Sequence, residues 1–90
     1  MAQARYVRCQ VSPGFFGDEF YVVIDGTSAY VNRSNVQVET EPARGAEVEG
    51  YVLAYLITEE EDRGVLVELP GEPVVGGLRT WVAKAQLQAA

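Results

Sequence analysis

Residues 47–58, EVEGYVLAYLIT, form the longest predicted strand of the chain and decide the expected fold. Successive side chains of a strand point to opposite faces, so every second residue belongs to the same face. One face of this stretch carries Val48, Val52, Ala54 and Leu56. The other face carries Tyr51, Leu53, Tyr55 and Ile57. Both faces are therefore apolar, whereas a strand with one face in water alternates apolar with polar residues.

Three explanations of the two apolar faces stay open at this point. In the first, the strand bends at Gly50 and serves two parts of one barrel. In the second, a loop of the same chain covers the outer face, and in the third a second copy of the protein covers it.

The flanking sequence predicts further strands and no helix. One apolar set of side chains recurs at every second residue over 5–11, 20–25 and 65–69, and these runs are rich in Val, Ile, Tyr and Phe. Turn signals separate these runs, namely Pro13-Gly14, Gly17-Asp18, Asp25-Gly26, Arg44-Gly45, Asp62-Arg63-Gly64, Pro70-Gly71 and Gly76-Gly77. We expect one all-β domain over residues 1–90, a small barrel or tightly packed two-sheet domain of five to seven strands.

The chain also matches itself at two offsets. At an offset of 45 residues, Tyr6 aligns with Tyr51 and Gly26 with Gly71. After these glycines the offset becomes 51, because residues 72–80 form a loop six residues longer than residues 27–29.

These offsets predict an internal repeat with pseudo-two-fold symmetry. The two units cover about residues 5–38 and 50–89 and are joined by an acidic link, residues 39–49. The alternative is that any two hairpins of an alternating chain resemble each other.

The end of each unit resembles a known type of small barrel. AYVNRSNVQV (29–38) and TWVAKAQL (80–87) resemble the closing segment of Src-homology-type β-barrels, in which an aromatic-aliphatic strand passes through a one-turn helix into a last short strand. The resemblance implies a small-barrel architecture. The acidic loop signatures and paired tyrosines of that family are not present, so its recognition of proline-rich peptides is not carried over.

Composition excludes several classes of function. The 90 residues include 13 acidic and 7 basic side chains, one cysteine and no histidine, with a formal net charge of −6. The acidity argues against binding nucleic acid or an anionic membrane surface. The missing histidine excludes Ser-His-Asp and Cys-His mechanisms, and the single cysteine excludes a disulfide framework or a multi-cysteine zinc site.

Charge and apolar patterning also bear on location. Residues 39–72 carry ten acids and two arginines, whereas residues 1–38 are balanced. The start, MAQARYVRC, has no apolar segment typical of a secretory signal, and no run approaches the length of a membrane span. We expect a cytoplasmic protein with an acidic flank.

Five aromatic residues are the candidate partner-binding residues. Phe15 and Phe16 lie in the glycine-flanked loop SPGFFGDE (12–19), where one of them either folds back as a lid over a barrel end or stays exposed as an anchor for a partner. The same two interpretations apply to Val74-Val75 in the loop 71–80. Tyr51, Tyr55 and Trp81, with Tyr30, belong either to the core and barrel rim or to an aromatic surface.

No pattern predicts a catalytic, cofactor or metal site. The acids 59–62 are expected to be a solvated hairpin tip, since consecutive strand residues point alternately and the spacing of a calcium loop is missing. Asp18, Glu19 and Asp25 fit turn chemistry better than acid–base catalysis. Cys9 alternates with valines and is expected to be a core residue rather than a reactive thiol.

Three functions remain open for such a chain. The leading one is a non-enzymatic module that binds a protein partner through apolar residues. The second is an acidic inhibitor or nucleic-acid mimic, and the third is a small-molecule-binding barrel or an enzyme of unrecognised chemistry. A homodimer is compatible with all three.

Overall fold

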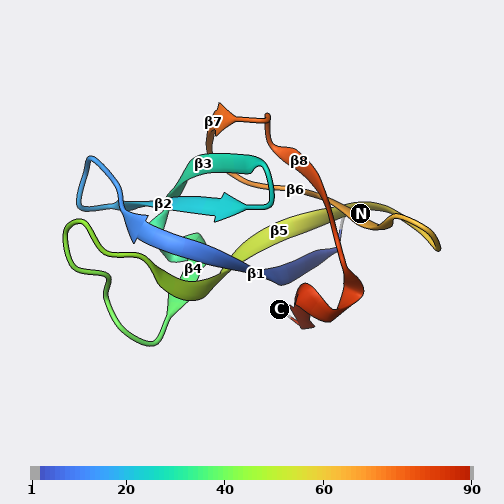
Figure 1. Ribbon diagram of the computed structural model, residues 1–90, viewed down its shortest axis with the longest axis horizontal. Coiled ribbons are helices and arrows are strands. Elements are labelled where there is room, and N and C mark those ends of the chain that lie inside the picture. The colour runs from blue at the N-terminus through green and yellow to red at the C-terminus, as the bar shows by residue number, and fades with distance from the viewer. Residues whose placement is uncertain (1–2, 90) are drawn as a thin grey trace.

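The computed structural model describes residues 3–89 and shows one strongly curled antiparallel sheet that forms a half-barrel (Figure 1). The predicted all-β fold is confirmed. The outermost residues of the predicted domain, 1–2 and 90, lie outside the described residues. The strands are β1 (Ala4–Pro13), β2 (Glu19–Ile24), β3 (Thr27–Asn32), β4 (Val36–Val38), β5 (Val48–Glu60), β6 (Gly64–Glu68), β7 (Glu72–Val75), β8 (Arg79–Val82) and β9 (Leu87–Ala89).

Two 3-10 turns interrupt the strands, η1 (Arg33–Asn35) and η2 (Lys84–Gln86). Across residues 3–89, no helix has the length and apolar character needed to cross a membrane. The nine strands of this range exceed the five to seven expected. The additional ones are short, since β4 and β9 have three residues each and β7 has four, too few for alternation to be recognised in the sequence.

β1 and β5 form the centre of the sheet. The strand order is β7-β3-β2-β1-β5-β6-β8, with β4 paired to β5 and β9 paired to β1 in addition. One edge of β5 pairs with β1, and its other edge pairs first with β4 and then with β6. This pairing agrees with the first explanation of the two apolar faces, in which one strand serves two parts of a barrel. On the outer face, Tyr55 and Ile57 are each 40% exposed, so no described loop covers that end of the strand.

The core fills the concave side of the sheet. Alternate residues of each long strand point inward, as on β1, where Val7, Cys9 and Val11 are buried between exposed neighbours. The buried apolar residues are Val7, Cys9, Val11, Phe20, Val22, Ile24, Ala29, Val31, Val52, Ala54, Val65, Val67, Leu69 and Val82. At the centre, Val7 lies opposite Val52, and both are 0% exposed.

Several strand pairings of the two halves of the chain correspond. Gln10 of β1 pairs with Val23 of β2, and 45 residues later Tyr55 of β5 pairs with Glu68 of β6. Likewise β9 pairs with the start of β1 as β4 pairs with the start of β5. The turns η1 and η2 lie 51 residues apart.

Gly50 on β5 is closely packed between β4 and β1. A Cβ atom on Gly50 would lie 2.7 Å from the Gln37 carbonyl oxygen, 2.8 Å from a Val38 methyl group and 2.9 Å from a Val11 methyl group. Two of these neighbours are core side chains and the third is backbone, so none can move away easily.

We therefore expect Gly50→Ala to lower the free energy of unfolding by about 1–3 kcal/mol through overpacking. Gly17→Ala is the matched control, because nothing lies within 4 Å of a Cβ at Gly17. The control is expected to change stability by less than about 0.5 kcal/mol, as at other exposed positions. Urea unfolding followed by circular dichroism measures both variants. Equal midpoints for the two variants would contradict the close packing at Gly50.

Cys9 provides a second test of the core. Burial, with a smaller contribution from the negative charge of Glu49, raises the pKa of the Cys9 thiol to about 12. The thiol of an unfolded chain ionises near pH about 8.5. Between these values the unfolded chain releases a proton that the folded chain retains, so stability present at neutral pH is lost as pH rises.

Between pH 8 and pH 10 this ionisation is expected to remove about 2 kcal/mol of unfolding free energy. The Cys9→Ala variant lacks the thiol but keeps every other ionisable group. The stability of the natural chain relative to this variant should therefore decrease over that range, measured by urea unfolding at each pH. A difference that does not change with pH would show that Cys9 ionises normally.

Candidate functional site

Residues 14–18, which connect β1 to β2, are called the aromatic loop because they carry Phe15 and Phe16. These two side chains are 80% and 71% exposed. The expectation that one of them folds back as a lid over the barrel end is therefore wrong. The structure leaves two adjacent aromatic side chains on a surface loop.

Phe15 packs on the outer face of the neighbouring strands. Its ring centre lies 5.3 Å from that of Tyr30 on β3, which in turn lies 5.3 Å from that of Tyr21 on β2. Tyr21 pairs with Tyr30 across the two strands and points away from the core, because its neighbours Phe20 and Val22 are buried. Tyr21 was not among the predicted aromatic residues, although the alternation of residues 20–25 already places it on the face opposite Phe20 and Val22.

Hydrogen bonds fix the backbone of the aromatic loop. The Phe15 N–H donates to a Glu19 carboxylate oxygen at 3.1 Å, and the Glu19 N–H donates to the Phe16 carbonyl at 3.2 Å. On the other side, Nε of Arg33 donates to the Gly17 carbonyl at 2.8 Å. The loop is thus held from β2 and from the turn η1, and its two phenylalanines are presented by an ordered backbone.

The other three predicted residues lie elsewhere. Tyr51 and Tyr55 are on the outer face of β5, the first half-buried and the second 40% exposed. Trp81 is half-buried on β8, where the guanidinium carbon of Arg63 lies 4.2 Å from the centre of its ring. The structure therefore brings Phe15 and Phe16 together but does not join them with Tyr51, Tyr55 and Trp81 in one site.

Val74 and Val75 form a further exposed apolar pair. They lie on β7, at one edge of the sheet, and are 48% and 58% exposed. β7 pairs with β3, so that Glu72 lies opposite Tyr30. The exposed valines therefore belong to the strand next to the ring row formed by Phe15, Tyr30 and Tyr21.

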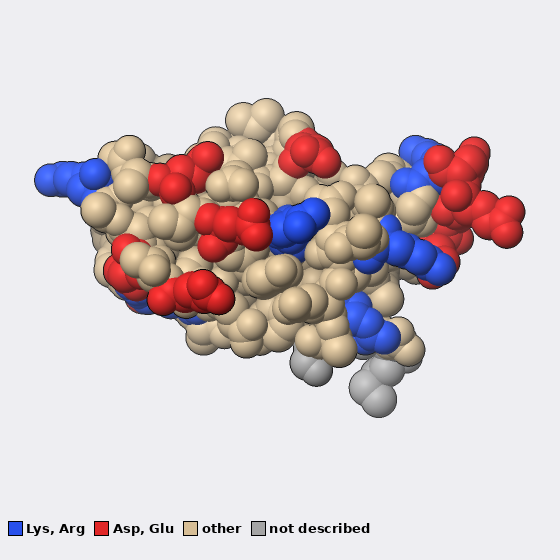
Figure 2. All heavy atoms as spheres, turned by 60° about the horizontal axis from the view of Figure 1, so that its bottom comes forward, with Lys and Arg blue, Asp and Glu red and all other residues tan. Residues whose placement is uncertain are grey.

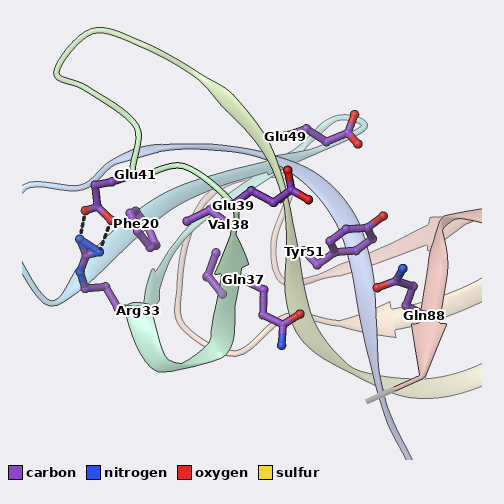
Figure 3. A pocket seen from close by; sticks show the side chains of 11 residues that line it. Phe20, Arg33, Gln37, Val38, Glu39, Glu41, Glu49, Tyr51 and Gln88 are labelled. Atoms are coloured by element: carbon purple, nitrogen blue, oxygen red, sulfur yellow. Dashed lines mark hydrogen bonds and ion pairs between the residues drawn. The ribbon is translucent and has the colours of Figure 1, made fainter.

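A groove of about 780 Å³ is lined mainly by residues of β4, of the segment after it and of the beginning of β5 (Figure 3). Its volume is within the usual range of ligand sites. The residues that line it are Phe20, Arg33, Val36, Gln37, Val38, Glu39, Glu41, Glu49, Gly50, Tyr51 and Gln88. Of the five predicted aromatic residues, Tyr51 alone lines this groove.

The charges of the groove are only partly paired. Arg33 stacks over the Phe20 ring, with its guanidinium carbon 4.3 Å from the ring centre, and forms an ion pair with Glu41 (Figure 3). Glu39 and Glu49 have no ion-pair partner among residues 3–89. The groove is therefore acidic, and carboxylates and amides are the polar groups that it offers to a ligand.

The acids 59–62 lie at the tip of the β5–β6 hairpin, at one end of the molecule (Figures 1 and 2). Two of them form ion pairs. Nζ of Lys84 lies 2.5 Å from Oε2 of Glu59, and Nη1 of Arg63 lies 4.0 Å from Oε1 of Glu60. No group of three or more metal-ligating side chains occurs within the described part of the chain.

The chain was compared with family models, curated proteins and solved structures, and no match was found in any of the three.

Proposed function

We propose that the chain is a non-enzymatic module that binds a partner protein through the aromatic loop. The observation that carries the proposal is the exposure of Phe15 and Phe16, 80% and 71%, on a loop whose backbone is fixed. Burying one large apolar side chain is worth about 1.5–3 kcal/mol. Two such side chains side by side are typical of the aromatic anchors that dominate protein interfaces.

The fixed backbone supports the same proposal. An interface loop that is flexible in the free protein must be ordered when it binds, which reduces affinity. Because Glu19 and Arg33 already hold the aromatic loop, most of this ordering cost is met by folding. The row of Tyr30 and Tyr21 extends the apolar surface beyond the loop.

The test is capture of partners from native lysate by the immobilised chain. The variant Phe15→Ala/Phe16→Ala should reduce the captured partner at least tenfold, while its melting temperature stays close to that of the natural chain. Ile57→Ala is the matched control, because Ile57 is also a large exposed apolar residue but lies on β5. Undiminished capture by the double variant, or its unfolding, would refute the role of the loop.

The second candidate function is an acidic inhibitor or nucleic-acid mimic. Glu39 and Glu49 in the groove and the net charge of −8 over residues 39–72 favour it. Recognition of this kind depends on charge and is screened by salt, whereas apolar recognition is not. Repeating the capture in 1 M salt separates the two functions, since the proposed apolar contact should survive and an acidic mimic should release its partner.

The internal repeat is also a proposal. It is supported by the pairings that correspond in residues 5–38 and 50–89, although β5–β6 has a bulge after Leu56 that β1–β2 lacks. The repeat bears on function because β3 and β8, which are equivalent strands of the two halves, differ in whether another strand covers their outer edge.

A further inference from the structure

β3 and β8 occupy equivalent places in the two halves but have different neighbours. Tyr21 of β2 pairs with Tyr30 of β3, and the corresponding Leu66 of β6 pairs with Trp81 of β8. The other edge of β3 is covered by β7, whereas β8 is the last strand of the sheet and, among residues 3–89, pairs only with β6. β8 therefore presents an edge that β3 does not.

The direction of the edge groups follows from hydrogen bonds at the ends of each strand pair. In an antiparallel pair, residues whose N–H and C=O groups face the partner alternate with residues whose groups face away. The bond from the Arg33 N–H to the Asp18 carbonyl, 2.9 Å, sets this alternation for β3. It turns the N–H and C=O groups of Ser28 and Tyr30 away from β2 and toward β7, in which Val75 and Glu72 lie opposite them.

The same reasoning gives the open groups of β8. The Leu69 N–H donates to the Leu78 carbonyl at 2.8 Å, which turns the N–H and C=O groups of Arg79 and Trp81 away from β6. The next outward N–H, that of Ala83, already donates to the Gln86 side chain at 2.9 Å. The unpaired edge thus consists of two residues, Arg79 and Trp81.

The cause of the difference is the longer loop of the second half. Residues 72–80 include β7, which adds itself to β3 of the first half. In the first half, a tight turn at Gly26 joins β2 directly to β3, so no strand is available to cover β8. An exposed strand edge of this kind is a template for pairing with another extended chain.

The charges near the C-terminal end of β8 indicate which side chains an extended segment bound to this edge would carry. A groove of about 650 Å³ lies where β8 ends, lined by Trp81, Lys84, Asp25 and the tip residues 59–63, with others. Asp25, Glu61 and Asp62 have no ion-pair partner among residues 3–89. A basic side chain entering this groove would meet unpaired carboxylates.

We propose that β8 binds an extended segment of a partner protein as an added antiparallel strand, with Lys or Arg at the N-terminal end of that segment. The orientation follows β7, whose first residue, Glu72, lies opposite Tyr30, the counterpart of Trp81. The N-terminal end of the added strand therefore lies opposite Trp81, beside the acidic tip. This inference goes beyond the proposed function and does not depend on the aromatic loop.

The probe is the synthetic peptide Lys-Lys-Thr-Val-Thr-Val-Thr-Val. Amide hydrogen exchange of the folded chain is measured by NMR with and without saturating peptide. Exchange of the Arg79 and Trp81 amides should slow at least tenfold, because the added strand accepts their hydrogen bonds. A peptide with glutamates in place of both lysines should bind at least tenfold more weakly, and one with N-methylated valines should not protect these amides.

Charge reversal at the tip tests the orientation. Glu61→Lys/Asp62→Lys should weaken the lysine peptide at least tenfold and strengthen the glutamate peptide. Glu72→Lys is the matched control, because Glu72 is an exposed acid at the opposite edge of the sheet. This variant should leave the affinities for both peptides unchanged. The variant Phe15→Ala/Phe16→Ala should bind the peptide normally, so failure here is distinguishable from failure of the proposed function.

Three results would overturn the inference. The first is no protection of Arg79 and Trp81 by the peptide, and the second is protection of the β7 edge instead. The third is protection of these two amides without peptide, together with a solution mass twice the 9.8 kDa of one chain, which would assign the edge to a second copy.

Discussion

The pairing of β1 with β5 is the constraint on which the rest of the structure depends. The register runs from Ala4 opposite Tyr55 to Val11 opposite Val48, and Val7 and Val52 meet at its centre with no exposed surface. A shift by one residue would turn these valines outward and bring the tyrosines of β5 into the core. The alternation of side chains therefore fixes the register, and each of the two strands then offers its second edge to others.

The pairing of those second edges determines where the aromatic loop and the acidic tip lie. The end of β1 pairs with β2, so the aromatic loop that joins them projects from one end of the sheet (Figure 1). The end of β5 pairs with β6, so the acidic tip projects from the other end (Figure 1). The same hairpin geometry thus presents apolar side chains at one end and carboxylates at the other, because the loop sequences differ while the pairing does not.

The sequence alone was sufficient to predict the strands in which side chains alternate over many residues. The stretch 47–58 is found as β5, Val48–Glu60, and the buried Val52 and Ala54 belong to one of the two faces that the alternation defined. Periodicity alone did not reveal the strands β4 and β9, because three residues carry no alternation. Only the resemblance of the closing segments implied a short last strand, and its pairing is fixed by distant partners.

The candidate site was predicted less completely, for a related reason. Phe15 and Phe16 could be recognised from the sequence as unusual loop residues. The contact of Phe15 with Tyr30 could not be predicted. That contact depends on Glu19 and Arg33 holding the loop backbone, and Arg33 comes from a turn 14 residues later in the chain. The open edge of β8 likewise cannot be predicted from the four residues of that strand, because it results from the pairing of β7 with β3.

The separation of the two surfaces has an energetic consequence. The molecule is 38 Å long, and the aromatic loop and the acidic tip lie toward opposite ends of it (Figure 1). Contacts this far apart with no shared side chains contribute independently to binding free energy. A partner that carries both an apolar pocket and a basic extended segment gains from both contacts only if the connection between them spans the length of the sheet. The β1–β5 pair separates the two surfaces, so under the two proposals recognition depends on the spacing of the two elements in a partner as well as on their chemistry.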